Sequence, residues 1–352
     1  MFRGMMMSAF AAVMSVLGAG GDGALAAGIE IKNATVTAEI SPWCMTFGFI
    51  HDPSFGPTDV SAGVKYTSVL LTPPQAVIAV NSGDVDVDEC VAISSLTQAW
   101  IKGARNMVVV GVGSAKPIYA LVANSRFRRL EDLRGGTVGS AGPQSIATQS
   151  AEMILKRGAN LLAERDYSFI SAGTGSARFA ALLVGKIDAL SMYPPFTYRL
   201  ADDGFSILGY EADYVPDYVA GTLAVNRTWA ERNRAAVVAM LKSMVRTAQW
   251  LKDPANKDKA IGSMAEAIRV GGKGIGQAYA ARLYDDFIIK QALSFNGYAN
   301  EERFTMAMNF MAERGFLEKK DYPLLSELVD FSYLNEALKE LSLPQVKQFA
   351  KK

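Results

Sequence analysis

Histidine, cysteine and an excess of either charge are what this sequence has little of. Its 352 residues include one histidine, His51, and two cysteines, Cys44 and Cys90. A single histidine argues against a metal site built on histidines and against catalysis that uses several of them, while carboxylate chemistry stays open. His51 lies in a loop rich in Gly and Pro, and we expect an ordinary surface residue there. We expect no metal and no cofactor.

Charge and composition exclude a second class of function. The chain has 36 Lys and Arg residues against 35 Asp and Glu, a formal net charge of +1, so there is no electrostatic basis for binding nucleic acid. A hydrophobic content of 50% with 20% charged residues is ordinary for a soluble globular protein. The length predicts two domains or two lobes with ample core.

Long apolar runs are confined to the N-terminus. Arg3 precedes the run 5–20 (MMMSAFAAVMSVLGAG), and Ala24-Leu25-Ala26 follows it. This order is typical of a secretory signal peptide, predicted over 1–26 and cleaved near Ala26, whereas the glycines at its end make the run too short to anchor the protein in a membrane. We expect no stable membrane insertion of the mature protein. Because no cysteine lies at the cleavage site to carry a lipid, we expect a freely diffusing protein of the periplasm.

The periplasm is an oxidising compartment, which bears on the two cysteines. Cys44 and Cys90 could form one disulfide, but two separately buried thiols fit the sequence equally well, since spacing alone does not establish the geometry.

Strand and helix patterns alternate over the first two thirds of the chain. Strands rich in β-branched residues are predicted at 35–40, 64–71, 85–93 and 107–112, with helices at 75–81 and 96–102. A second series follows, with strands at 137–139, 169–171, 189–192, 204–209 and 219–225, and beyond Asn226 the chain is almost wholly helical. Strands separated by helices predict an α/β fold with parallel sheets.

Five short segments resemble those of a known family. They are 82–86 (SGDVD), 130–139 (LEDLRGGTVG), 185–189 (GKIDA), 203–208 (DGFSIL) and 226–229 (NRTW). Their order and spacing between about 73 and 252 resemble periplasmic solute-binding proteins of ABC importers, of the nitrate/sulfonate/thiamine-pyrimidine-binding type. One departure is the segment from Cys44 to Gly63, which is broken by Pro and Gly where that family has a long helix. The role of this segment stays open.

The resemblance implies a two-lobed periplasmic-binding-protein fold, type II-like, in which each lobe is a mainly parallel sheet flanked by helices. Two crossing strands, expected at 118–124 and 219–225, would form the hinge. Lobe one would comprise 28–123 plus 221–352, and lobe two 124–220. The ligand would be bound between the lobes.

Candidate ligand contacts follow from where ligands bind in such sheets, beyond the carboxyl ends of the strands. The loop 140–145 follows the strand 137–139 and opens a helix. Ser140, Gln144 and Ser145 there can offer hydroxyls and an amide beside free backbone N–H groups, which suits an anionic or strongly polar group. Plain helix capping by Ser145 is the structural alternative.

Other candidates lie at corresponding strand ends, and each also has a structural explanation. Trp43 can stack on a planar ligand or be buried under its loop, whereas the serines and threonines can simply cap the next helix. The loop 173–176 lacks the glycine pattern of a nucleotide site. Asp188 is expected to be a turn residue, and Arg178 is the arginine nearest to these loops. The further candidates are Ser41, Pro42, Trp43, Thr72, Ser94, Ser95, Thr174 and Tyr193.

The sequence therefore predicts a binding protein and not an enzyme. It would capture a small organic solute, anionic or planar or both, by hinge closure, and deliver it as a monomer to an ABC permease with its ATPase. One alternative is a ligand-sensing module for a membrane receptor. A pyrimidine-synthesising enzyme on the same fold would need a reactive histidine and a metal-binding cysteine cluster, which one histidine and two separated cysteines disfavour.

Overall fold

The first of two five-stranded sheets combines strands from the beginning of the chain with one strand that returns to it late in the sequence. The computed structural model describes residues 29–35, 64–71, 73–143, 145–173, 175–271, 279–290 and 294–350. The strand order is β2-β1-β3-β10-β4. The strands are β1 (Ile29–Thr35), β2 (Val64–Leu70), β3 (Val87–Ala92), β4 (Met107–Ser114) and β10 (Gly221–Asn226). β1 pairs in parallel with β2 and β3, and β10 runs antiparallel to both β3 and β4.

The second sheet repeats this plan with the order β7-β6-β8-β5-β9. Its strands are β5 (Ala120–Ala123), β6 (Thr137–Ser140), β7 (Ser168–Ser171), β8 (Ala189–Met192) and β9 (Ser206–Tyr210). β6 is parallel to β7 and β8, and β5 is antiparallel to β8 and β9. In each sheet, therefore, one strand opposes the direction of the other four. The predicted mainly parallel sheets are confirmed.

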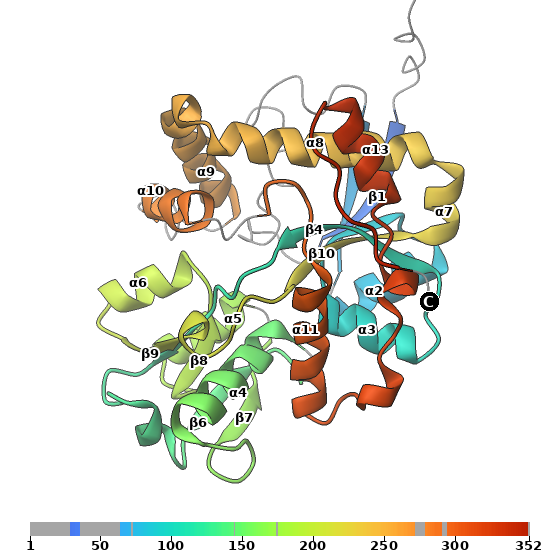
Figure 1. The fold of residues 1–352 in the computed structure, drawn as a ribbon. Coiled ribbons are helices and arrows are strands. Elements are labelled where there is room, and N and C mark those ends of the chain that lie inside the picture. The colour runs from blue at the N-terminus through green and yellow to red at the C-terminus, as the bar shows by residue number, and fades with distance from the viewer. Residues whose placement is uncertain are drawn as a thin grey trace, which may run out of the picture.

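Helices cover the sheets as the sequence pattern requires. All eight residues of β4 (MVVVGVGS) are buried although β4 is the last strand in the sheet order. Its outer edge is covered by later segments, since the backbone N–H of Val112 donates to the Gly297 carbonyl and that of Asp330 donates to the Val109 carbonyl, both at 2.8 Å. Figure 1 shows α8 and α13 above the strands of the first sheet, with α2 and α3 below them. These helices are α2 (Pro73–Ser82), α3 (Ile93–Ile101), α8 (Arg234–Lys252) and α13 (Ser332–Glu340).

Gly111 explains how closely α8 approaches the sheet. A Cβ at this position would lie 3.2 Å from Cδ2 of Leu241 and 3.5 Å from Cε of Met244, both on α8. The glycine in β4 thus lets a long helix lie directly on the strand, and larger side chains there would push it away.

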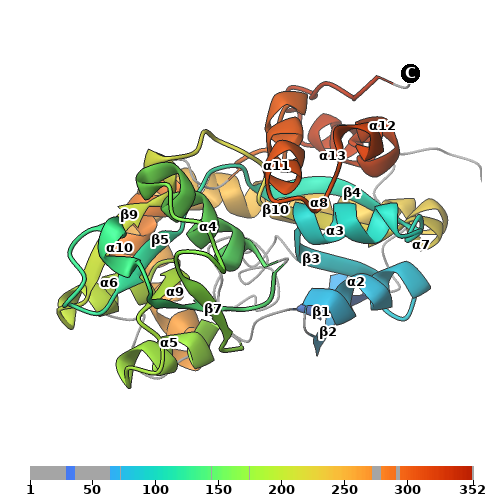
Figure 2. The same cartoon turned by 90° about the horizontal axis from the view of Figure 1, so that it is seen from below.

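The second sheet has α4 (Ile146–Ala159), α5 (Gly175–Leu183) and α6 (Phe196–Asp202) around it. The remaining helices are α7 (Arg227–Arg232), α9 (Lys257–Gly271), α10 (Ala280–Tyr284), α11 (Glu301–Glu313) and α12 (Leu325–Leu328). Figure 2 shows the two sheets with their helices side by side as two halves. No helix in the described part of the chain is both long and apolar enough to cross a membrane.

The chain passes between the sheets twice. The segment 115–119 joins β4 to β5, and the segment 211–220 joins β9 to β10. β5 pairs within the second sheet, although the sequence-based division at residue 123 placed it in lobe one. We therefore propose that lobe two begins in the crossing segment before Ala120. The rest of the predicted division stays a prediction.

Some expectations fall on residues outside the described ranges. These are the signal peptide at 1–26, the irregular segment from Cys44 to Gly63 and most of the strand predicted at 35–40. Cys90 is a disulfide-bonded cysteine. The sequence holds one other cysteine, Cys44, which lies outside the described residues.

Candidate functional site

The loop after β6 is tied to the first turn of α4 by a chain of hydroxyl groups. Ser140 Oγ and Ser145 Oγ each lie 2.8 Å from Thr148 Oγ1. The backbone N–H of Gly142 donates to Ser140 Oγ at 3.0 Å, and that of Thr148 donates to Ser145 Oγ at 3.2 Å. Ser145 is thus the N-cap of α4. Ligand contact by Ser140 and Ser145 stays a prediction beside this structural role.

The start of α3 presents a different situation. The N-cap position is Ala92, which has no capping side chain, so Ser94 does not cap this helix. Ser94 is 5% exposed and Thr97 is fully buried, and within the described part of the chain neither hydroxyl has a hydrogen-bond partner. Ser95, the neighbouring candidate, is half-buried. Buried hydroxyls are normally paired, so this helix start holds unused hydrogen-bonding capacity.

Tyr193, directly after β8, lies in an aromatic cluster. Its ring meets Tyr119 edge-on with centroids 5.5 Å apart, and Phe196 at 5.8 Å. Its side chain is 8% exposed. A Cβ added at Gly175 would lie 3.7 Å from the Tyr193 hydroxyl oxygen, which places that hydroxyl beside the start of α5. Tyr119 comes from the outward crossing, so the cluster joins the hinge to the end of the sheet.

Arg178 lies in the same place, and sequence reasoning noted it only as the nearest arginine. Arg178 is 4% exposed to solvent, and its Nη1 donates to the Gly173 carbonyl at 2.8 Å. Its Nε is buried without a hydrogen-bond partner among the described residues. Burial lowers the pKa of Arg178, because desolvation disfavours the charged form; the neighbouring Tyr119 and Tyr193 act in the opposite direction.

The absence of a side chain at Gly139 makes room for Ile187, and the stem of Arg178 lies at ordinary contact distance from the same backbone. A Cβ on Gly139 would lie 2.4 Å from Cδ1 of Ile187 and 3.7 Å from Cδ of Arg178. The aliphatic stem of Arg178 therefore runs beside the backbone of β6, and its guanidinium reaches the loop after β7 at Gly173. The ends of β6, β7 and β8 are brought together at this edge, as the parallel order predicts.

The remaining predicted residues divide into two groups. Asp188 is a structural residue, since its Oδ2 accepts from the backbone N–H of Thr137 at 2.8 Å and from its hydroxyl at 2.9 Å. Asp188 also forms an ion pair with Arg126. The candidates outside the described residues are Ser41, Pro42, Trp43, Thr72, Gln144 and Thr174.

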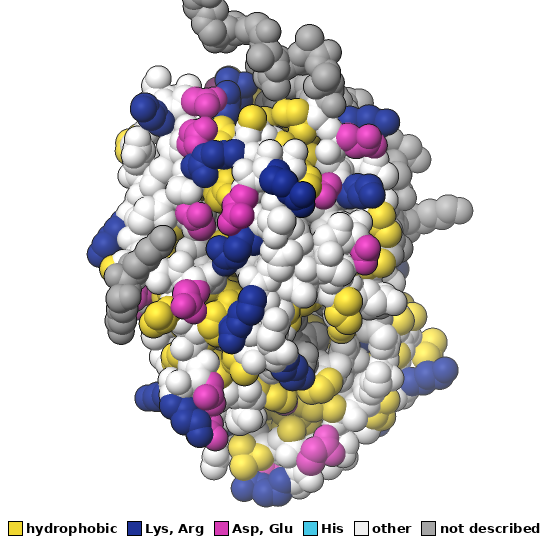
Figure 3. Space-filling model, turned by 90° about the vertical axis from the view of Figure 1, so that its right-hand side faces the viewer, with side chains coloured by type: hydrophobic (Ala, Val, Ile, Leu, Met, Phe, Trp, Pro, Cys, Tyr) yellow, Lys and Arg dark blue, Asp and Glu magenta, His cyan; other side chains and the backbone are white. Residues whose placement is uncertain are grey.

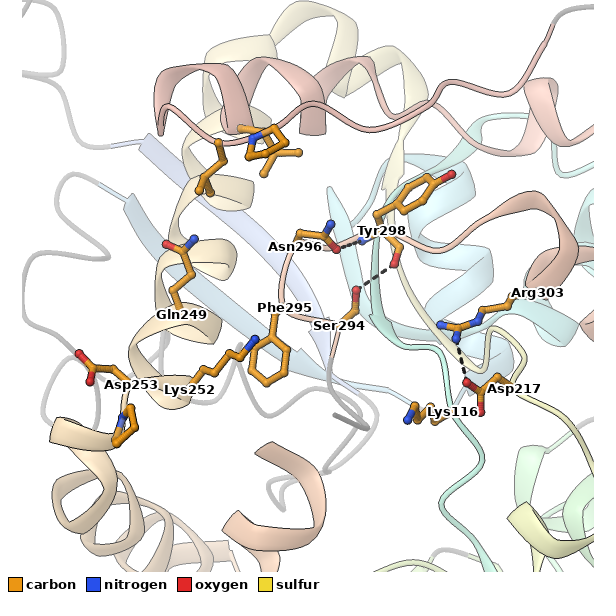
Figure 4. Close-up of a pocket in the computed structure, with 14 residues that line it drawn as sticks. Lys116, Asp217, Gln249, Lys252, Asp253, Ser294, Phe295, Asn296, Tyr298 and Arg303 are labelled. Carbon is orange, nitrogen blue, oxygen red and sulfur yellow. Dashed lines mark hydrogen bonds and ion pairs between the residues drawn. The ribbon is translucent and has the colours of Figure 1, made fainter. Parts of the chain in front are cut away.

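A separate cavity of about 850 Å³ lies beside the crossing segments. Figure 4 shows that it is bounded by both crossing segments, through Lys116 and Asp217, by the end of α8 and by the loop that precedes α11. Arg303 Nη2 donates to Asp217 Oδ2 at 2.8 Å, and Ser294 Oγ donates to the Tyr298 carbonyl at 3.0 Å.

The two lysines of this cavity are also engaged. Lys252 Nζ lies 4.9 Å from the centre of the Phe295 ring, and Lys116 Nζ donates to the Lys290 carbonyl at 3.4 Å. The Arg303–Asp217 pair joins the return crossing to α11, and Lys116 joins the outward crossing to the Lys290 carbonyl, so the lining of this cavity supports both crossing segments.

Ion pairs link the two halves at α11 and α4. Arg157 Nη2 lies 3.1 Å from both carboxylate oxygens of Glu313, and Arg314 pairs with Glu152. Elsewhere, on the face shown in Figure 3, basic and acidic side chains are scattered side by side. This face therefore carries no field of one sign, in agreement with the net charge.

The described residues contain no cluster of three or more His, Cys, Asp or Glu side chains that could hold a metal ion.

Comparison with known proteins agrees with this architecture. Residues 106–265 match the model of the NMT1-like family. No curated protein matches the sequence. A solved structure from Bordetella bronchiseptica RB50 is similar with a TM-score of 0.70 at 19% identity, and the match covers 89% of this chain and 98% of that one.

Two further similar structures are those of solute-binding proteins. The alkanesulfonate-binding protein SsuA from Xanthomonas axonopodis, bound to MOPS, is similar with a TM-score of 0.63 at 18% identity, covering 86% of this chain and 98% of its own. The periplasmic nitrate-binding protein NrtA from Synechocystis has a TM-score of 0.66 at 11% identity, with 90% of each chain covered. The predicted resemblance to solute-binding proteins of ABC importers is confirmed, and the chain has the periplasmic-binding-protein fold.

Proposed function

We propose that the protein is a periplasmic substrate-binding protein, which captures a small organic solute between its two lobes and delivers it to an ABC permease. The observation that carries the proposal is the edge of the second sheet at the ends of β6, β7 and β8. Ser140, Arg178 and Tyr193 gather there beside the starts of α4 and α5. Strand ends with helix N-termini are where α/β sheets bind polar ligands.

The two crossings supply the mechanism. They allow a hinge motion, and a ligand that contacts both lobes only in the closed state stabilises that state by its difference in affinity. Ser94 and Thr97, whose buried hydroxyls have no hydrogen-bond partner among the described residues, are the contacts that we propose for the first lobe. Export with cleavage near Ala26, a monomeric state and the absence of catalysis are parts of the same proposal. A ligand-sensing module for a membrane receptor would use the same cleft, and no feature of the described residues favours it.

A thermal-shift screen with the mature protein tests the proposal. The panel contains organic sulfonates, aromatic carboxylates and pyrimidines. A solute present at about 100 times its Kd should raise the free energy of unfolding by about 2.7 kcal/mol. Each solute that raises the Tm is then recovered and analysed by mass spectrometry. Return of the unchanged solute supports a binding protein. Conversion of the solute, or a panel that produces no shift, contradicts the proposal.

A further inference from the structure

We propose that Arg178 is the ligand's counter-charge, so that the solute is an organic anion whose charged group lies against this guanidinium. The inference rests on the proposed function and goes further, because it names one anchoring residue and the charge of the ligand.

Arg178 is buried to a degree that arginine seldom reaches without a partner of opposite charge. Its exposure is 4%, and within the described part of the chain no carboxylate forms an ion pair with it. Other arginines near the hinge and the second sheet have such partners, including Arg126, Arg134 and Arg303. Removing a cation from water costs several kcal/mol unless a counter-charge is present. A bound anion would offset that cost.

The donors of Arg178 are only partly used. A guanidinium has five N–H groups. Among the described residues, Arg178 donates one hydrogen bond, from Nη1 to the Gly173 carbonyl. Nε has no hydrogen-bond partner there. The planar fork matches the oxygens of a carboxylate or a sulfonate in pairs, which a lysine would not do.

The position of the guanidinium fits a ligand contact. It lies at the loop that follows β7, next to the Tyr193 hydroxyl and the first turn of α5. The positive end of the α5 dipole reinforces the same sign of charge. The edge-to-face rings of Tyr119 and Tyr193 provide apolar surface beside it for the uncharged part of the solute.

A purely structural role makes a different prediction. If Arg178 served only to hold the loop at Gly173, its replacement would destabilise the ligand-free protein. If it is an uncompensated charge kept for a ligand, replacement should leave the ligand-free stability unchanged or increase it, as at other sites where function is kept at the expense of stability.

The test compares the full-length mature wild type with Arg178→Gln and Arg199→Gln by isothermal titration calorimetry and thermal unfolding. Arg199 pairs with Asp203 on the surface of α6 and controls for the loss of one positive charge. The probes are benzoate, benzenesulfonate and ethanesulfonate, each paired with its uncharged amide. We expect the wild type and Arg199→Gln to bind at least one anion tenfold or more tightly than its amide. Arg178→Gln should lose this preference with no fall in its ligand-free Tm.

Three other results are informative. Wild-type protein that binds the amides as well as the anions overturns the role of Arg178 and leaves the proposed function standing. A ligand-free Tm that falls in Arg178→Gln, with equal loss of both probe classes, also overturns it and assigns the residue a structural role. Wild-type protein that binds none of the probes overturns the proposed function itself within these solute classes.

Discussion

The hydrogen bond between Tyr218 and Glu211 should stabilise the hinge more at alkaline than at acidic pH. Tyr218 donates to Glu211 Oε1 at 2.7 Å, and the backbone N–H of Tyr119 donates to Oε2 at 3.4 Å. Glu211 and Tyr218 belong to the return crossing, whereas Tyr119 belongs to the outward crossing. Glu211 is fully buried and Tyr218 is 2% exposed. One carboxyl group thus holds both crossings together.

The pH dependence follows from the burial of this carboxyl. Burial raises the pKa of Glu211 from 4.5 to about 7, although the bonds from Tyr218 and Tyr119 oppose the rise. A carboxyl whose folded pKa lies above its unfolded value holds its proton longer when folded. The free energy of unfolding therefore falls as the pH rises from about 4.5 to about 7. Removing the Tyr218 hydroxyl raises the pKa of Glu211 further, so the fall should continue to higher pH.

Tyr218→Phe should lower the free energy of unfolding by an amount that depends on pH. Below pH 7 the lost bond is between neutral groups and costs about 0.5–1.5 kcal/mol, whereas above it the partner is a carboxylate and the cost is about 1.5–3 kcal/mol. Urea unfolding at about pH 5.5 and about pH 8.5 should therefore give losses that differ by roughly 1 kcal/mol or more.

Tyr284→Phe is the matched control. Tyr284 is also fully buried, and its hydroxyl donates to the Leu251 carbonyl at 2.7 Å, a group that does not titrate. Its loss should be the same at both pH values. If Tyr218→Phe lowers the free energy of unfolding equally at both pH values, the reasoning is refuted. It is also refuted if Tyr218→Phe, made in a protein that already carries Glu211→Gln, still causes a pH-dependent loss.

Two further predictions concern single groups. Asp88 is 1% exposed, and burial raises its pKa to about 7. In urea titrations, Asp88→Asn should therefore leave the free energy of unfolding nearly unchanged near pH 5 and raise it by on the order of 1–3 kcal/mol near pH 8.5. A lower free energy of unfolding at both pH values would contradict this. Ser145→Ala removes the cap bond from the Thr148 N–H and should cost about 1 kcal/mol in the ligand-free protein, measured as a lower Tm by circular dichroism. Ser145→Thr keeps a capping hydroxyl and should recover most of it, and a Ser145→Ala variant of unchanged Tm would show that the cap contributes nothing.

Local pattern in the sequence was enough to predict most of the elements. The run MVVVGV at 107–112 is apolar throughout, and β4 is accordingly buried on both faces. Small residues mark the loops after β6 and β7, and Ser145 has the residue type that caps helices. These features depend on neighbours along the chain, which is why they could be predicted.

The candidate site was predictable only in part. The strand-end rule placed Ser140, Ser145 and Tyr193 at one edge of the second sheet, and the structure brings them together there, because parallel strands present their carboxyl ends together. Their contact with a ligand stays a prediction. It did not indicate that Ser94 would be buried without a partner, since that depends on the packing around α3. Nor did it separate a capping role from a ligand contact at Ser145.

The sequence by itself determined the alternation of strands and helices, the mainly parallel order and the family resemblance, because these follow from periodicity and from turn residues close together in the chain. The tertiary structure alone decided which charges are buried and what they face. Arg178 lies beside the backbone of β6 with its Nη1 on the Gly173 carbonyl, and Glu211 is enclosed because Tyr119, 92 positions away, crosses beside it. Burial and charge pairing depend on residues distant in sequence, and only the folded chain brings these together.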